Sequence, residues 1–182
     1  MSESGNGLLA GQVCVVMGIQ NRWSIAYAIA EALAEAGGTL ALTYIDDRAG
    51  RDANTLLEKY GGKGYTCNVA EDADIDKLAE GLKADFGKVD TLVHSIGFAP
   101  AAELAGRFVD TSRAGFQVAL DISCYSLVAS AARIAPLMTE GGSIMTLTHL
   151  GADRAFPKYN VMGVAKAALE SSVRYLAYDL GE

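Results

Sequence analysis

Short apolar runs alternate with longer amphipathic stretches along almost the whole chain, and this alternation constrains the fold more than any other feature. The apolar runs are VCVVMG at 13–18, TLALTY at 39–44, GYTCNV at 64–69, VDTLVHS at 89–95 and GSIMTLT at 142–148. Helical patterns lie between them near 24–36, 49–60, 72–86 and 112–138, and a last one lies near 157–180. Such strand and helix repeats build parallel sheets with helices on both faces. We therefore predict an α/β fold with a doubly wound parallel sheet, formed by residues 1–182 as a single domain.

The bulk composition limits the kind of partner. Of 182 residues, 51% are hydrophobic and 20% are charged, so the chain can bury one core and is too apolar to be disordered. The formal net charge is −7, without a dense block of lysine and arginine. This balance argues against nucleic acid or an anionic membrane surface as a partner. We expect a small-molecule ligand.

The sequence also argues against a membrane span or signal peptide, a disulfide framework and a metal site. No apolar run approaches the length of a membrane span, and the first residues, MSESGNGLLAG, have no basic start, so we expect no signal peptide and a cytoplasmic location. The cysteines, Cys14, Cys67 and Cys124, are odd in number and widely spaced, which predicts reduced, structural thiols. The two histidines have no acidic partner at ligand spacing, so we expect no metal site.

The first apolar run leads into GIQNRWSIA at 18–26. In doubly wound folds this strand-to-helix turn binds a pyrophosphate, because a glycine permits a tight turn and the helix start offers unpaired N–H groups. Gly18 is the only glycine here, followed by the small residues Ser24 and Ala26, so an ordinary turn remains the alternative. In VHSIGFAP at 93–100, Gly97 would let the backbone lie against a flat ring. Both cues predict one ligand crevice at the carboxyl ends of the first and fourth strands.

The segment KYNVMGVAK at 158–166 places Tyr159 and Lys166 seven positions apart in a helical pattern. Seven residues are about two helical turns, so both side chains would share one face, roughly 10 Å apart along the axis. Both would reach one extended ligand, with the cation biasing the phenol towards its ionised form. The alternative is a half-exposed tyrosine and a solvated lysine on an ordinary amphipathic helix.

Four segments carry a resemblance to a known family: G-x5-S-I-A-Y at 18–27, HSIGFAP at 94–100, DISCYSLVA at 121–129 and LGADRAFPKYNVMGVAKAALESSVRYLA at 150–177. With them the chain closely resembles, over essentially its whole length, the NADH-dependent enoyl-acyl-carrier-protein reductases, a divergent branch of the short-chain dehydrogenase/reductase family. The resemblance implies a Rossmann-type fold and a role in fatty acid biosynthesis. The implied reaction is reduction of the trans-2 double bond of enoyl thioesters on acyl carrier protein or coenzyme A.

The resemblance also implies roles for individual residues. Tyr159 would hydrogen-bond the thioester carbonyl oxygen, and Lys166 would hold the nicotinamide ribose hydroxyls. The implied cofactor-binding residues are Gly18, Ser24 and Ile25 at the pyrophosphate, Val69 at the adenine, and Ser95, Ile96 and Gly97 at the adenosine ribose and neighbouring cofactor surface. Asn68 stands where the family often has Asp, and its carbonyl oxygen can still accept a hydrogen bond from the adenine amino group.

Coenzyme choice rests on TYIDDRAGR at 43–51. Asp46 or Asp47 could take the ribose 2′-hydroxyl and repel a 2′-phosphate, whereas Arg48 or Arg51 could favour one. The alternative is a solvated charged loop. We expect NADH rather than NADPH.

Three positions depart from the family pattern or offer another chemistry. This branch usually carries a second tyrosine at position 149, where His149 either donates a hydrogen bond to the substrate oxygen or is a tolerated, non-catalytic replacement. Thr146 stands where more distant dehydrogenases use a serine, and it is either a hydroxyl donor or a core strand threonine. His94 is expected to be a packed histidine at a strand end.

Family members continue beyond the position of Gly181 with a sixth strand, a mobile substrate-binding segment and a seventh strand used in subunit contacts. The 182 residues contain none of these, so the expected sheet lacks the family's last two strands, and its fifth strand would be a naked edge. The chain is then either a fragment of a longer reductase or a shortened paralogue. The long apolar helix at 112–138 has too little polar surface for a solvent-facing flank, which predicts subunit association, and the resemblance implies that it packs against its counterpart in a homodimer or homotetramer. Two other functions stay open: a short-chain carbonyl (3-ketoacyl) reductase using Thr146, Tyr159 and Lys166, and a truncated NAD-binding module without turnover.

Overall fold

The structure is a computed structural model that describes residues 7–181. These residues cluster into two compact units. Unit 1 consists of the described part of Met1–Ser95 together with Arg133–Thr146, and unit 2 consists of Ile96–Ala132 together with the described part of Leu147–Glu182. That the two units form one domain stays a prediction.

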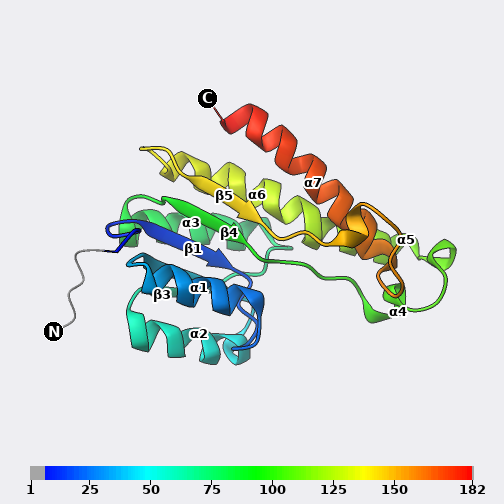
Figure 1. The fold of residues 1–182 in the computed structure, drawn as a ribbon, viewed down its shortest axis with the longest axis horizontal. Helices are drawn as coiled ribbons and strands as arrows, with labels where there is room; N and C mark the ends of the chain where they lie inside the picture. Colours follow the sequence, from blue (N-terminus) through cyan, green and yellow to red (C-terminus); the bar gives the residue numbers. More distant parts are fainter. Residues whose placement is uncertain (1–6, 182) are drawn as a thin grey trace. The chain divides into compact units, whose positions relative to one another are not determined.

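Unit 1 contains a five-stranded sheet in which all pairs of neighbouring strands are parallel (Figure 1). Its strand order is β3-β2-β1-β4-β5. The strands are β1 (Val13–Met17), β2 (Thr39–Tyr44), β3 (Lys63–Thr66), β4 (Thr91–His94) and β5 (Ser143–Thr146). The order reverses between β1 and β4, which confirms that the first and fourth strands flank the topological switch point of a Rossmann-type sheet.

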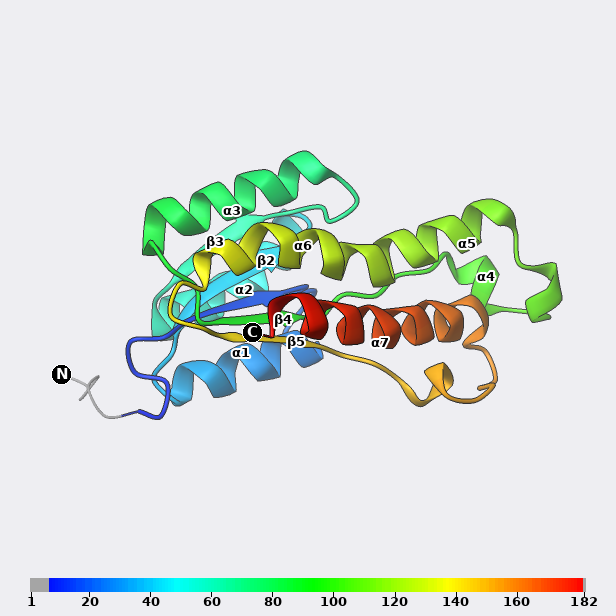
Figure 2. The ribbon, with the colours of Figure 1, turned by 90° about the horizontal axis from the view of Figure 1, so that it is seen from above.

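Three helices of unit 1 cover this sheet: α1 (Ile25–Glu35), α2 (Asp47–Tyr60) and α3 (Asp72–Phe86). Figure 2 shows α1 and α3 on opposite faces of the sheet. On the α1 and α2 face, Val16 and Leu42 of neighbouring strands pack with Ala30 and Leu56 of the two helices. Helix α3 has the predicted bounds, 72–86, and the next residue, Gly87, adopts the left-handed conformation with a φ of 74°.

Burial along the strands follows their place in the sheet. All residues of β1 and β4 are buried, as are the four inner residues of β2, which confirms strands covered on both faces. The outer strands β3 and β5 contain no buried residue. The three cysteines are buried free thiols, as predicted.

Unit 2 is mainly helical. It contains α4 (Ala101–Leu104), a 3-10 turn (Phe108–Asp110), α5 (Arg113–Leu120), a π-helical segment (Asp121–Tyr125), most of α6 (Ser126–Ile134), a second 3-10 turn (Leu150–Ala152) and α7 (Asn160–Leu180). Helix α7 packs against α4, α5, the π-helical segment and the second 3-10 turn, and Figure 2 shows it running alongside α5. Ala99, Ala119, Val161, Met162 and Ala165 form the small core of this unit.

One expectation about the helices is wrong. The last helix begins at Asn160 rather than 157, so Tyr159 is the residue before the helix and not part of it. The long helix predicted at 112–138 is confirmed, from Arg113 to Leu137, and with a mean hydropathy of 1.4 it is long and apolar enough to cross a membrane. Half of its most apolar window is buried inside the protein, and core helices pass the same test.

Candidate functional site

Tyr159 lies at the start of α7 between two residues with unusual backbone angles. Lys158 has a φ of 61° and Asn160 a φ of 38°, a region that residues other than glycine seldom adopt. Each such residue costs on the order of 1–3 kcal/mol and persists only where neighbouring contacts hold it. The Asn160 side chain donates hydrogen bonds to the carbonyl oxygens of Ala105 (3.5 Å) and Gly106 (3.4 Å). The chain therefore turns sharply on both sides of the tyrosine.

Two glycines let the Tyr159 ring lie close to the preceding turn. A Cβ atom on Gly151 would stand 2.5 Å from Cδ1 of Tyr159, and one on Gly163 would stand 2.6 Å from the carbonyl oxygen of Gly151. Burial raises the pKa of Tyr159 above its ordinary value of 10.0. The expectation that a cation would bias this phenol towards ionisation is therefore wrong for this structure, because desolvation of the charged form dominates. The phenol is kept as a hydrogen-bond donor.

His149 lies directly against Tyr159. The two ring centroids are 4.1 Å apart at an interplanar angle of 33°, and the Phe156 ring meets the imidazole edge-on at 5.1 Å. The backbone N–H of Gly151 donates to Nδ1 of His149 over 2.9 Å. Because Nδ1 accepts this hydrogen bond, the neutral ring carries its proton on Nε2. No pattern in the sequence predicts this contact with Gly151.

Lys166 is a buried cation in α7, with 7% of its surface exposed. Its Nζ donates hydrogen bonds to the carbonyl oxygens of Leu147 (2.8 Å) and Ile96 (3.3 Å). Burial lowers its pKa from the ordinary value of 10.5. The alternative of a solvated surface lysine is therefore wrong, and the structure brings Lys166 together with two of the predicted cofactor residues, Ile96 and Gly97.

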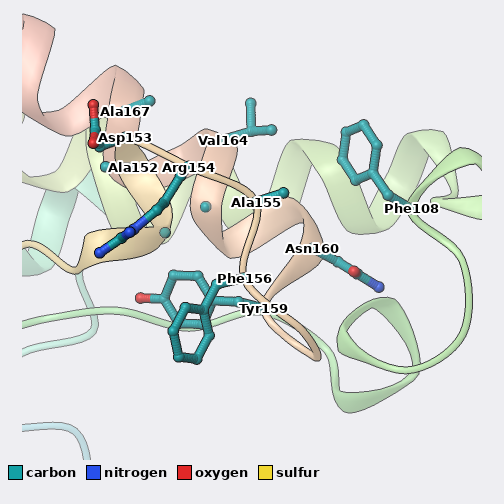
Figure 3. Close-up of a pocket in the computed structure, with 12 residues that line it drawn as sticks. Phe108, Ala152, Asp153, Arg154, Ala155, Phe156, Tyr159, Asn160, Val164 and Ala167 are labelled. Carbon is teal, nitrogen blue, oxygen red and sulfur yellow. The ribbon is translucent and has the colours of Figure 1, made fainter.

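A pocket of about 430 Å³ lies beside Tyr159 within unit 2. Figure 3 shows Tyr159 and Phe156 on one side of it and Phe108 on the other. Its wall is mostly apolar and small-residue surface, and Arg154 and Asp153 also line it. A pocket with these walls next to a phenol donor suits an apolar ligand that carries one polar reacting group.

Unit 1 holds the predicted pyrophosphate residues. Gly18 follows β1 with a φ of 95°, which requires glycine, and its N–H donates to the buried Thr43 hydroxyl (3.3 Å). Ser24 is the N-cap of α1, and its Oγ accepts from the N–H of Tyr27 (3.3 Å) while donating to the carbonyl of Asn21 (2.7 Å). Ile25 is 64% exposed. The turn thus has the tight glycine that the sequence predicted, and Ser24 in addition caps the helix start, which was not predicted.

The other predicted cofactor residues of unit 1 lie at strand ends or in loops. Asn68 and Val69 follow β3, and the Asn68 Oδ1 accepts from the N–H of Ala70 (3.2 Å). Ser95 follows β4, where its N–H bonds the carbonyl of Met17 (3.1 Å). Asp46 caps α2 by accepting from the N–H of Ala49 (2.8 Å), so one of its oxygens is already engaged.

Thr146 and His94 bond each other across the neighbouring strands β5 and β4. The Thr146 hydroxyl donates to the His94 carbonyl (3.1 Å), and its oxygen lies 3.0 Å from Nδ1 of His94. Since the single hydroxyl proton goes to the carbonyl, Nδ1 is the donor in the second contact. His94 is fully buried. His94 is therefore the packed histidine at a strand end that was expected, and Thr146 is a strand threonine bonded to it, although Thr146 is only partly buried and not part of the core.

Sequence reasoning missed Ser123. Its hydroxyl accepts from the N–H of Phe98 (2.8 Å) and donates to the carbonyl of the same residue (2.9 Å), so it holds the loop that carries Ile96 and Gly97. Ser123 lies in the segment DISCYSLVA that carries the resemblance. Its contact with Phe98 was not predicted, because a π-helical turn inside an apolar helix has no pattern of its own in the sequence.

The parallel sheet, its reversal between β1 and β4, and the glycine turn after β1 define a Rossmann-type α/β protein. A family model described as "Enoyl-(Acyl carrier protein) reductase" matches residues 18–182. The enoyl-[acyl-carrier-protein] reductase [NADH] 1 of Rhizobium meliloti is 49% identical over 178 residues, which are 97% of this chain and 65% of the relative. The chain therefore belongs to the enoyl-acyl-carrier-protein reductase family.

Solved structures agree with this family. The Bacillus cereus enoyl-acyl carrier protein reductase, crystallised with NADP+ and indole naphthyridinone, superimposes with a TM-score of 0.93 at 45% identity, covering 97% of this chain and 70% of that one. The enzyme of Anaplasma phagocytophilum in complex with NAD gives 0.93 at 42% identity, covering 99% and 70%. The chain spans about two thirds of the length of the curated relatives that it matches, 65% and 66% for the first two.

The burial of Lys166 generates a prediction about its titration. Desolvation disfavours the ammonium form, so we expect Lys166 to lose its proton at lower pH in the folded protein than in the unfolded chain. The measurement is a pH titration of its 13Cε resonance, assigned by comparison with Lys166→Arg, in buffer and in urea. A folded midpoint at or above the unfolded one would contradict the burial described here.

Proposed function

We propose that the chain is an NADH-dependent enoyl-acyl-carrier-protein reductase that reduces the trans-2 double bond of enoyl thioesters in fatty acid biosynthesis. The observation that carries the proposal is the pairing of a buried ammonium, Lys166, with a partly buried phenol donor, Tyr159, at the start of one helix. The printed names of the relatives, which specify NADH, support it.

The residues present fit a dinucleotide. Gly18 has the left-handed backbone that a phosphate-binding turn uses, and a Cβ atom on Gly97 would stand 3.4 Å from the Lys166 Nζ, so Gly97 keeps the space above the ammonium open. Lys166 has three N–H donors, of which two bond the main-chain carbonyls of Ile96 and Leu147. The third is suited to a ribose hydroxyl.

When bound, NADH would supply the hydride that reduces the β-carbon of the enoyl thioester. The protein then has to stabilise the negative charge that develops on the thioester oxygen. Tyr159 is protonated at neutral pH, because burial raises its pKa, and it donates a hydrogen bond to this oxygen. The two glycines behind its ring fix the direction of that donor before the reaction begins.

The first test is steady oxidation of NADH by the 182-residue protein in the presence of a crotonyl thioester. Tyr159→Phe should lower kcat by about 100-fold while changing NADH affinity less than about twofold, since the hydroxyl acts on charge that forms in the transition state. Lys166→Ala should weaken NADH binding by about tenfold, because it removes a charge-assisted hydrogen bond. Equal loss of turnover and affinity in Tyr159→Phe would show that the tyrosine serves binding instead.

The rival carbonyl reductase is disfavoured by Thr146. That function needs the Thr146 hydroxyl as a substrate donor, but the hydroxyl proton goes to the His94 carbonyl inside the sheet of unit 1. Reduction of a 3-ketoacyl thioester, with no oxidation of NADH by the crotonyl thioester, would support the rival. Binding of NADH without turnover of either thioester would support the other rival, a binding module without chemistry.

We also propose NADH rather than NADPH as the coenzyme. Asp46 and Asp47 are exposed after β2, where a carboxylate accepts from a ribose 2′-hydroxyl and repels a 2′-phosphate. The capping bond to Ala49 occupies Oδ1 of Asp46, which leaves the Asp47 carboxylate and the second Asp46 oxygen for this task. Tighter binding of NADPH than of NADH would contradict the assignment.

We propose that His149 supplies a second donor to the substrate oxygen through Nε2–H. Three contacts support this role: the stacking on Tyr159, the edge contact with Phe156, and the hydrogen bond that fixes the proton on Nε2. Protonation of Nδ1 would replace the acceptor facing the Gly151 N–H by a second donor, which would drive the ring from this position. The neutral imidazole is therefore the active form.

This role predicts the effects of two substitutions on the steady oxidation of NADH. His149→Tyr should keep activity, because a phenol also donates a hydrogen bond to the substrate oxygen, whereas His149→Phe should lower the rate, because it removes the second donor. An unchanged rate in His149→Phe would show that His149 is a bystander.

We propose that the protein forms a homodimer or homotetramer in the cytoplasm. Exposed aromatic side chains support self-association: Phe116 and Tyr125 on the long helix, and Tyr175 and Tyr178 on α7, are 37%, 50%, 70% and 83% exposed. We expect sedimentation at about 20 μM to show at least a dimer, because exposed aromatic side chains are enriched at interaction sites. A monomer would contradict the assembly, and recovery in the membrane fraction would contradict the location.

A further inference from the structure

The π-helical segment Asp121–Tyr125 interrupts the long helix of unit 2 beside the candidate site. Such segments are rare in proteins and occur often at functional positions, because the extra residue turns side chains in directions that a regular helix does not offer. Two side chains of this segment contact other parts of unit 2. Ser123 bonds the main chain of Phe98, and the Cys124 thiol lies 3.4 Å from the Ser172 hydroxyl of α7.

Ser123 holds both main-chain polar groups of one loop residue. Its side chain is fully buried, and its hydroxyl accepts from the N–H of Phe98 (2.8 Å) and donates to the carbonyl of Phe98 (2.9 Å). An alanine here would remove the partner of both main-chain groups at once. One hydroxyl therefore fixes the position of the loop relative to the helix.

The same loop carries a partner of the buried ammonium. Ile96 lies two residues before Phe98, and its carbonyl accepts a hydrogen bond from Lys166 Nζ at 3.3 Å. Gly97 lies between them, and a Cβ atom on it would stand 3.4 Å from the Lys166 Nζ and 4.0 Å from the Ser123 Oγ. The Lys166 ammonium and the Ser123 hydroxyl thus both lie close to Gly97, because a Cβ atom on this residue would be in van der Waals contact with each of them.

We propose that Ser123 is a positioning residue that acts through the loop Ile96–Phe98 on Lys166. By fixing Phe98, it holds the Ile96 carbonyl against the ammonium and so keeps the third N–H of Lys166 directed at the coenzyme ribose. The part that concerns the coenzyme rests on the proposed function, whereas the part that concerns the loop and the ammonium does not.

The test compares Ser123→Ala with a matched control, Ser130→Ala. Ser130 lies in the same long helix and is also fully buried, but its hydroxyl has no hydrogen-bond partner in the described structure. Removing an unpartnered hydroxyl should be close to neutral. Ser123→Cys serves as a second variant if the alanine variant does not fold, because it fills the same space and forms only weak hydrogen bonds.

Two readouts are measured on each folded variant. The first is the rate at which a pulse of acetic anhydride labels Lys166, followed by mass spectrometry. Release of the loop removes an acceptor from the ammonium and opens it to solvent, so we expect the rate to rise by about fivefold in Ser123→Ala and to stay unchanged in Ser130→Ala. The second is the dissociation constant for NADH, measured with and without the additional change Lys166→Ala.

The pair of backgrounds separates positioning from general damage. We expect Ser123→Ala to weaken NADH binding by about fivefold when Lys166 is present and by less than about twofold when it is replaced, because the serine acts through the lysine. Equal weakening in both backgrounds, or labelling of Lys166 at the unmodified rate, would overturn the proposal. If the unmodified protein does not bind NADH, the proposed function fails, and the labelling rate alone decides the role of Ser123.

Discussion

The buried ammonium of Lys166 is the constraint around which unit 2 is arranged. A cation removed from water is costly unless polar groups replace the lost solvent, and here main-chain carbonyls at two separate points of the chain, Ile96 and Leu147, do so. Both carbonyls must therefore face the same atom. That requirement sets the path of the loop after Ser95 and of the segment before His149, and the π-helical turn with Ser123 keeps the first of them in place.

The tyrosine is held by a different kind of constraint. Its neighbours Lys158 and Asn160 adopt left-handed backbone angles, and two glycines allow its ring to approach the turn before α7. Strain of this kind persists only where contacts over-determine it, and such sites cluster where geometry matters for function. The lysine and the tyrosine are thus positioned independently, one by carbonyl acceptors and the other by close packing. This division agrees with separate duties in coenzyme binding and in stabilising charge on the substrate.

Much of the fold followed from periodicity, because β-branched runs and helical repeats encode it directly. The five strands and the four helices from 24 to 138 were predicted near their observed bounds. Tyr159 was misplaced inside the last helix, since left-handed angles at Lys158 and Asn160 have no signal in apolar spacing. The expectation that the Lys166 cation would favour the ionised form of the Tyr159 phenol is also wrong. The sequence indicates which charges are present but not how deeply they are buried, and burial raises the pKa here.

The most direct test of the proposed reaction is to follow the hydride. The protein is incubated with NADH deuterated at both C4 positions and a crotonyl thioester, and the product is analysed by mass spectrometry and deuterium NMR. The account predicts one deuterium per butyryl thioester, bonded to the β-carbon. In Tyr159→Phe the rate of deuterium transfer should fall by the same factor as turnover. Deuterium on a carbinol carbon of a 3-hydroxyacyl product formed from a 3-ketoacyl thioester, with none transferred to the crotonyl thioester, would contradict it.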